Sequence, residues 1–303
     1  MLSRVEANSG VSSGADRSPG SRTRRRRSRS RRVRRRALVL LAVAIVAAVA
    51  TFVATRPGPT RPGPTRHGTP GPAAGLSLAF DPTFSGTTLD TATWDTCYAY
   101  FVPASGCANF GNPVRDAWYL PSGDRVSGGA LHLVATAKPT RGHAKSGSPL
   151  TYPYTSGMVT TMKSFDFTYG YVQIVAKIPG GRGTWPALWL LPTSGTWPPE
   201  IDIMENFGSA NTIRATVFWS ASGAVKYVGK TAESPSDLTE GYHTYGLLWR
   251  PHSLTWYLDG KVVDTYEGSH VPHQPMYLLA NLAIDGRAAS RSTFSIRSVE
   301  VYR

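Results

Sequence analysis

The chain has 303 residues, a formal net charge of +14 and a sequence pI of about 10.0. Residues 1–76 carry 16 Arg and no Lys against only Glu6 and Asp16, whereas residues 77–303 carry 17 basic and 17 acidic groups. A basic tail therefore precedes a neutral body, which excludes a uniformly basic nucleic-acid-binding domain, and the length allows one large domain or two small ones.

Residues 1–36 form an Arg-rich tail that ends in SRTRRRRSRSRRVRRR. Such a run can bind nucleic acid or acidic lipid, or it can set membrane topology. Residues 37–54 follow it with 18 positions and no charge, about the minimum length of a membrane-spanning helix. Arginines beside such a helix hold that end in the cytoplasm. We therefore expect a membrane partner, no nucleic acid, and a body outside the cytoplasm.

The apolar segment is predicted to be a retained signal anchor. A cleaved signal peptide normally has a short basic start and an apolar core of about 7–15 residues, and both are longer here. If the segment is cleaved, the body is secreted. Residues 55–76 repeat TRPGP and offer almost nothing apolar to bury, so they are predicted to form an extended, semi-rigid linker.

Cys97 and Cys107 are the only two cysteines. Outside the cytoplasm two nearby cysteines usually pair, so we predict a local disulfide that closes a loop. Two free thiols are the alternative. A metal site is not expected, because the sequence has no cluster of His near the two cysteines.

Residues 77–303 are predicted to form one all-β domain. Asp-Gly between the two apolar runs of LTWYLDGKVVDTY is a strong hairpin signal, and no window of 12 or more residues in the body has a helical apolar period. Many short strands at even spacing favour a two-sheet antiparallel sandwich. The predicted strands lie at residues 130–137, 171–178, 212–219, 242–250, 254–260, 261–267, 276–284 and 294–303.

The stretch EIDIME places Glu200, Asp202 and Glu205 within six positions. Because side chains alternate along a strand, the first two acids should share a face with Met204. Glu205 should then point into the opposite, isoleucine-lined layer. One extra residue, a β-bulge near Ile203–Met204, would return all three acids to one face. We predict this bulge, since without it a carboxylate would be buried among apolar side chains.

Two glutamates on such a strand can bring their carboxyls to within about 5–8 Å of each other, which covers the spacings used in sugar hydrolysis, both with direct attack and with an intervening water. The spacing in sequence does not choose between the two. Like charges held close raise the pKa of one carboxyl, which keeps a proton available for a leaving group. A calcium site is the alternative, but calcium usually takes its ligands from loops.

Four of the eight tryptophans flank the acids. Trp185, Trp189 and Trp197 precede them, and Trp219 follows them. Sugar rings present C–H faces that pack on aromatic rings. Any one of these tryptophans alone is better explained as core, but four beside one acidic strand favour a sugar-binding site.

On these residues the chain resembles glycoside hydrolase family 16, a group of β-jelly-roll endoglycanases that includes laminarinases and lichenases. EIDIME has the bulged E-x-D-x-x-E form of the laminarinase-like members, and GTWPALWLLP, YHTYGLLWRPHSLTWYLDGKVV and PMYLLANLAIDG are also family-like. The similarity covers roughly residues 78–303. It implies a concanavalin A-like sandwich and a retaining endo-β-glycanase that cuts a polysaccharide, above all β-1,3- or mixed β-1,3/1,4-glucan.

Carried over by position, the resemblance implies that Glu200 is the nucleophile and Glu205 the acid/base, with Asp202 orienting Glu200. No metal or other cofactor is required. Proteins of this architecture often hold a structural calcium on the convex side, but no ligand set can be assigned in this sequence. We expect a monomer.

For substrate binding, the resemblance implies that Trp185 and Trp189 floor the subsite of the attacked sugar, and that Asp116 and Asn281 bond to sugar hydroxyls. Trp219 joins this set because it lies directly after the acidic strand.

The sequence departs from the family at Phe218, where many relatives carry a His, and the stretch RAASRSTF lacks a tryptophan that often follows Gly286. Phe218 puts the identity of the substrate and the rate of the reaction in doubt. Two alternatives stay open: a transglycosylase on the same scaffold, because the sequence does not show whether water or a sugar enters the acceptor site, and a membrane-tethered glycan-binding module without catalysis, for which Phe218 is the only hint.

Overall fold

A computed structural model describes residues 71–96, 117–144 and 147–303. The chain divides into two units, residues 1–66 and 67–303, and all the described residues belong to the second. Its elements are η1 (Gly71–Ala73), β1 (Leu78–Phe80), β2 (Ala117–Tyr119), η3 (Pro121–Gly123), β3 (Asp124–Ser127), β4 (Ala130–His143), β5 (Pro149–Ser156), β6 (Met158–Thr160), β7 (Asp166–Phe167), β8 (Gly170–Lys177), β9 (Thr184–Pro192), β10 (Glu200–Glu205), β11 (Thr212–Ala221), β12 (Ala224–Glu233), β13 (His243–Arg250), β14 (Ser253–Leu258), β15 (Lys261–Glu267), β16 (Met276–Ile284) and β17 (Arg291–Tyr302).

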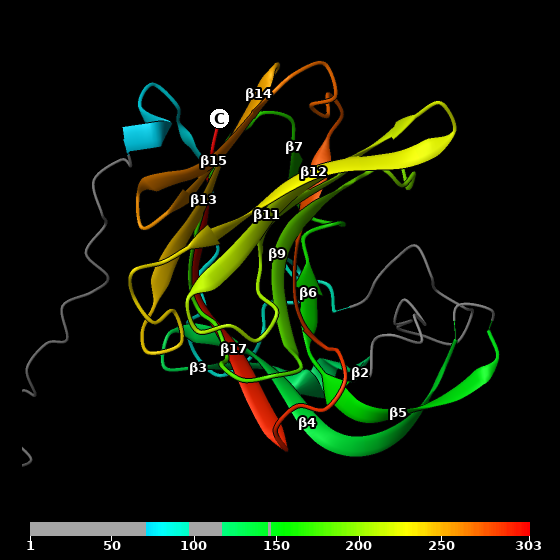
Figure 1. Ribbon diagram of the computed structural model, residues 1–303. Coiled ribbons are helices and arrows are strands. Elements are labelled where there is room, and N and C mark those ends of the chain that lie inside the picture. Colours follow the sequence, from blue (N-terminus) through cyan, green and yellow to red (C-terminus); the bar gives the residue numbers. More distant parts are fainter. Residues whose placement is uncertain (1–70, 97–116, 145–146) are drawn as a thin grey trace, which may run out of the picture. The chain divides into compact units, whose positions relative to one another are not determined.

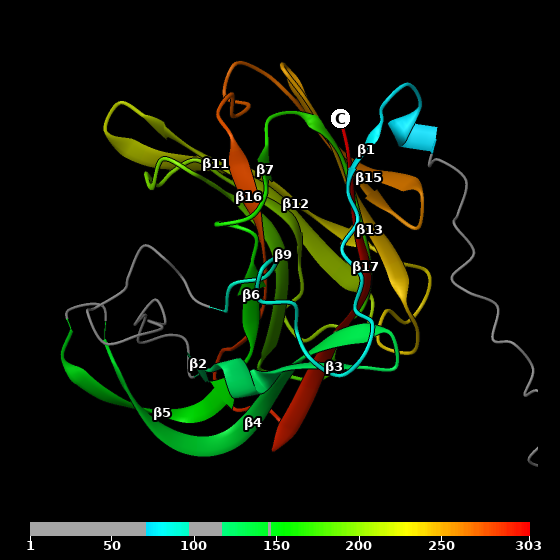
Figure 2. The same ribbon diagram turned by 180° about the vertical axis from the view of Figure 1, so that it is seen from behind.

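The strands form two sheets, which confirms the predicted all-β sandwich (Figures 1 and 2). The first sheet has the order β15-β14-β13-β8-β17-β4-β5-β2, with β1 added to β17 and β3 to β4. The second has the order β12-β11-β10-β9-β16-β6, with β7 added to β16. Among the described strands the pairings are antiparallel except for β2 with β5.

The main core lies between the two sheets, and strand periodicity shows how it forms. In β14 every second residue is buried, so Leu254, Trp256 and Leu258 point inward. β16 is instead buried along its whole length. One of its faces joins the main core, and the other packs with Trp189, Met158 and neighbouring side chains in a smaller cluster on the far side of the second sheet. The second sheet therefore has a structured outer face.

All eight strands predicted from β-branched and aromatic runs are present, as β4, β8, β11 and β13 to β17. The predicted hairpin joins β14 to β15, where Asp259 and Gly260 have φ angles of 49° and 74°. Positive φ at both central residues is what a two-residue type I′ turn requires, and Asp-Gly supplies it at low cost.

Several predictions fall on residues that the structure does not describe. These are the tail, the apolar segment 37–54, most of the linker, the predicted disulfide between Cys97 and Cys107, and Asp116. The described residues, 71–96, 117–144 and 147–303, include no helix with the length and hydropathy of a transmembrane segment.

Asp124 is an unusual carboxylate at the start of β3. Asp124 pairs with Leu133 on β4, and Val126, two positions later on the same strand, pairs with Leu131. Val126 and both leucines belong to the main core, so Asp124 points toward that core as well. Both of its carboxylate oxygens are buried. Burial raises the pKa of Asp124 to about 8, and the nearby backbone N–H of Met158 offsets only part of that shift.

Asp124 should therefore make the stability of the fold depend on pH. Between about pH 4 and pH 8 the folded state keeps this proton and the unfolded state releases it, so the free energy of unfolding falls as the pH rises, by at most about 1.4 kcal/mol per pH unit for one proton. The near-isosteric variant Asp124→Asn should remove this slope. Urea unfolding of both proteins from pH 5 to pH 8 measures it, and parallel pH profiles would contradict the assignment.

Candidate active site on the outer face of the second sheet

The strand EIDIME is β10, and it contains a β-bulge. Against β9, Asp202 pairs with Trp189, whereas Glu205 pairs with Ala187, a register that has shifted by one residue. The pairing with β11 shifts in the same interval, between Asp202 and Glu205. The bulge predicted from the spacing of the acids is therefore present.

The bulge places the three acids on one face. Ile203 and Met204, although adjacent, both belong to the main core. In an antiparallel sheet, directly opposed residues share a face. On β11 the partners of Glu200, Asp202 and Glu205 are residues 218, 216 and 214, which alternate regularly and so face one way. All three carboxylates thus project from the outer face of the second sheet.

Trp256 of the opposite sheet holds the bulge from the core side. Its indole N–H donates to the backbone carbonyl of Asp202 over 2.8 Å, and the side chain is 1% exposed. Asp202 is the residue after which the pairing with both neighbouring strands shifts. A carbonyl at such a shift is displaced from the regular ladder, and a buried carbonyl needs a donor. Trp256 supplies one.

Two further tryptophans bind the outer glutamates. The indole N–H of Trp197 donates to Oε2 of Glu200 over 2.7 Å, and that of Trp185 donates to Oε1 of Glu205 over 2.8 Å. Both glutamates are partly exposed, whereas Asp202 between them is 2% exposed. The site thus has two partly exposed carboxylates, each of which accepts a hydrogen bond from an indole N–H, and one buried carboxylate between them.

Trp189 and Asn281 lie beside the acids on the neighbouring strands β9 and β16. The indole N–H of Trp189 donates to Oδ1 of Asn281 over 2.7 Å, and Nδ2 of Asn281 donates to the hydroxyl of Tyr119 over 3.1 Å. Trp189 is 5% exposed and Asn281 is 1% exposed. Both lie on the acidic face of the sheet, but as buried supports and not as exposed surface.

The structure does not bring Trp219 to this face. Its neighbour Phe218 pairs with Glu200 and faces outward, so Trp219 points to the opposite side of β11. There it stacks on His270, with ring centroids 4.8 Å apart, and on Tyr266 at 6.0 Å. We therefore leave Trp219 out of the candidate site.

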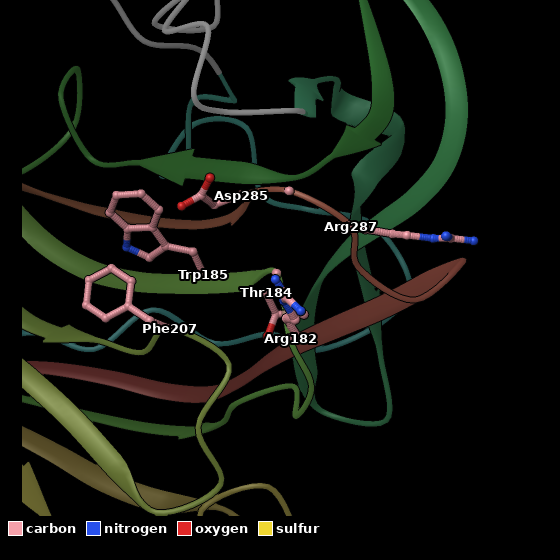
Figure 3. Close-up of a pocket in the computed structure, with 8 residues that line it drawn as sticks. Arg182, Thr184, Trp185, Phe207, Asp285 and Arg287 are labelled. Atoms are coloured by element: carbon pink, nitrogen blue, oxygen red, sulfur yellow. The ribbon is translucent and has the colours of Figure 1, made fainter.

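A pocket of about 730 Å³ adjoins the Glu205 end of the site through Trp185. Its aromatic wall is the pair Trp185 and Phe207, whose ring centroids lie 4.9 Å apart. Asp285, Arg182 and Arg287 line the rest, and Figure 3 shows Arg287 pointing away from the aromatic pair. Aromatic rings with a few polar groups are typical of pockets that bind small ligands.

Sequence reasoning missed two exposed aromatics on this face. Phe207 lies two positions after Glu205, so its closeness to the acids was a usable signal. Tyr227 lies opposite Phe218 only because β12 pairs with β11, and no local feature of the sequence shows that. Phe218, noted for its departure from the family, lies directly across from Glu200.

The comparisons with known proteins agree with this geometry. A model described as glycosyl hydrolases family 16 matches residues 126–297. The endo-1,3-1,4-beta-glycanases EglC and ExsH of Rhizobium meliloti (strain 1021) are 37% and 34% identical over alignments of 226 and 228 residues, and these matches cover 70% and 71% of this chain. The chain spans about half the length of these two curated relatives, 47% and 48%. The resemblance drawn from EIDIME is confirmed.

Solved structures agree as well. The laminarinase catalytic domain of Thermotoga maritima superposes with a TM-score of 0.63 at 27% identity, covering 75% of this chain and 98% of that one. The endo-beta-1,3-glucanase of Pyrococcus furiosus gives 0.61 at 26% identity, covering 75% and 94%.

The hydrogen bond from Trp256 to the Asp202 carbonyl should stabilise β10 locally. Trp256→Phe keeps an aromatic ring in the core but removes the donor to the Asp202 carbonyl, so the backbone amides of β10 should exchange faster with solvent. Trp249→Phe is the matched control, because Trp249 is equally buried and its indole N–H donates to Pro272 O in a loop.

Hydrogen–deuterium exchange with mass spectrometry measures the effect. Protection of the β10 peptide should fall in Trp256→Phe and stay near that of the unmodified protein in Trp249→Phe. Equal protection of β10 in both variants would show that the indole does not hold the bulge.

Proposed function

The chain belongs to glycosyl hydrolase family 16, and from this we propose that it is a retaining endo-β-glycanase that cleaves β-1,3- or mixed β-1,3/1,4-glucan. One observation carries the proposal: a single bulge turns Glu200 and Glu205 onto the same face, each with its own indole donor. The names of the relatives, endo-1,3-1,4-beta-glycanases and a laminarinase, support the substrate class.

In the proposed first step Glu200 attacks the anomeric carbon of the sugar. A C–O bond forms between that carbon and the carboxylate as the glycosidic C–O bond breaks, and Glu205 gives its proton to the departing oxygen. In the second step Glu205, now a carboxylate, takes a proton from water. The resulting hydroxide displaces Glu200 from the anomeric carbon, so two inversions retain the configuration.

The neighbours of the acids suit these roles. The indole of Trp197 engages Oε2 of Glu200, and we assign the attack to Oε1. The indole of Trp185 engages Oε1 of Glu205, which fixes the rotamer of the proton donor. Asp202 lies buried between the two on the same face of the sheet, and we propose that it orients Glu200.

We also propose that the catalytic body acts outside the cytoplasm, tethered by the apolar segment 37–54 and spaced from the membrane by the Pro-rich linker. Its support is the sequence: an uncharged stretch of 18 residues directly after an arginine run. Cell fractionation tests it. Protein found only in the soluble cytoplasmic fraction would overturn it.

Replacing either glutamate should abolish or nearly abolish cleavage. Glu205→Gln should lower kcat on laminarin by about 10²–10⁴-fold, the usual contribution of general acid–base catalysis, and Glu200→Gln should leave no measurable turnover, because no covalent intermediate can form. Reducing-end assays on laminarin, lichenan, agarose and galactan measure this. Glu267→Gln, an exposed change on β15, is the control and should keep full activity.

Chemical rescue separates the two roles. Azide can replace water in the second step, so it should restore turnover of an activated substrate by Glu205→Gln and give a β-glycosyl azide. With Glu200 replaced by Ala, azide should attack directly and give the α-azide. The reverse pattern would exchange the two assignments.

Cleavage by the unmodified chain that gives only lengthened products would identify a transglycosylase, and binding of glucan without any cleavage would identify a glycan-binding module.

A further inference from the structure

Three aromatic rings extend from Glu200 toward the edge of the second sheet. Glu200 pairs with Phe218 on β11, and Phe218 pairs with Tyr227 on β12. Glu200, Phe218 and Tyr227 therefore form one row across three strands, and their side chains share the outer face. Trp197 completes the set, because its indole both bonds to Glu200 and lies 6.2 Å from the ring of Phe218, centroid to centroid.

The rings are contiguous and open to solvent. The centroids of Phe218 and Tyr227 lie 5.4 Å apart, with an angle of 39° between the ring planes. Trp197 is 55% exposed and Tyr227 is 59% exposed. A single exposed aromatic needs no explanation, but a connected run of them marks a binding surface.

The fold does not need this run for its core. Val217, next to Phe218 in sequence, points into the main core, so the three rings lie on the side of the sheet away from it. The hairpin between β11 and β12 turns at Ser222 and Gly223, whose φ angles of 52° and 74° fit a tight turn. This turn fixes the register that sets Tyr227 opposite Phe218. The hairpin therefore fixes the position of Tyr227 relative to Phe218.

The chemistry of the row selects an uncharged, flat sugar chain. The row offers ring faces, and the guanidinium of Arg214 lies 5.8 Å from the Tyr227 centroid. Glucose in β-linkage has equatorial hydroxyls and exposes C–H surface on both ring faces, whereas an axial hydroxyl would lift one face off an aromatic ring. The ring spacing is close to the length of one sugar residue.

We propose that Trp197, Phe218 and Tyr227 form a linear subsite that holds gluco-configured residues of the substrate on the Glu200 side of the cleaved bond. The proposal rests on the proposed function, since the row begins at the assigned nucleophile. It also gives Phe218 a role. An apolar ring at that position continues the stacking surface from Trp197 to Tyr227, so the subsite selects by shape and not by hydrogen bonds to hydroxyls.

Chain-length kinetics test the proposal with the full-length protein. For β-1,3-gluco-oligosaccharides of increasing length, Tyr227→Ala should lower kcat/KM of the longest substrates by about tenfold, the effect of losing the burial of one aromatic ring. The loss should fall mainly on KM and should shrink as the substrate shortens, because short chains do not reach Tyr227. Tyr227→Phe should behave like the unmodified protein, since the ring and not the hydroxyl is used.

Val262→Ala is the matched control, an equally exposed apolar change on β15 of the other sheet. If Tyr227→Ala matches this control at every substrate length, or loses activity equally at all lengths, the proposal is overturned while the glycanase assignment stands. Affinity electrophoresis in laminarin gels gives a readout without turnover. If laminarin slows the unmodified protein more than it slows Tyr227→Ala, the subsite is supported even when the protein cleaves nothing. Equal migration of the two proteins overturns the proposal.

Discussion

The bulge in β10 is the constraint on which the rest of the site depends. Regular alternation would turn Glu205 into the layer that holds Ile203, and a carboxylate in that apolar layer would cost several kcal/mol. The surplus residue lets Ile203 and Met204 both enter the core, so Glu205 returns to the face of Glu200 and Asp202. Core packing and the placement of the acids are therefore two results of one backbone feature.

Indole groups secure this arrangement from both sides of the sheet. From the core, Trp256 of the opposite sheet donates to the Asp202 carbonyl at the shift in register. From the outer face, Trp185 and Trp197 donate to the two exposed glutamates. An indole carries one N–H donor on a large apolar body, so it can pack against neighbours and still satisfy one oxygen. Trp185 and Trp197, two of the four tryptophans that suggested a sugar site in the sequence, therefore also hold its carboxylates.

The sequence predicted the features that depend on local pattern. The β-branched runs located eight strands, Asp-Gly located a hairpin, and the late position of Glu205 located the bulge. It could not predict which face a flanking aromatic occupies, because that depends on strand pairing: Phe218 faces the acids and adjacent Trp219 does not. β12 was missed because it is an edge strand with Lys and Gly along its length and most of its side chains exposed. Its Tyr227 therefore reached the candidate site only through its partner strand.

The most direct test of the account is to trap the covalent intermediate. A 2-deoxy-2-fluoro oligoglucoside with an activated leaving group should form a glycosyl-enzyme that turns over slowly, because fluorine destabilises the transition state of the second step. Peptide mass spectrometry then locates the added mass. The account predicts that it lies on Glu200 alone and is absent from Glu200→Gln. An adduct on Glu205 or Asp202, or cleavage that gives products of inverted configuration, would contradict it.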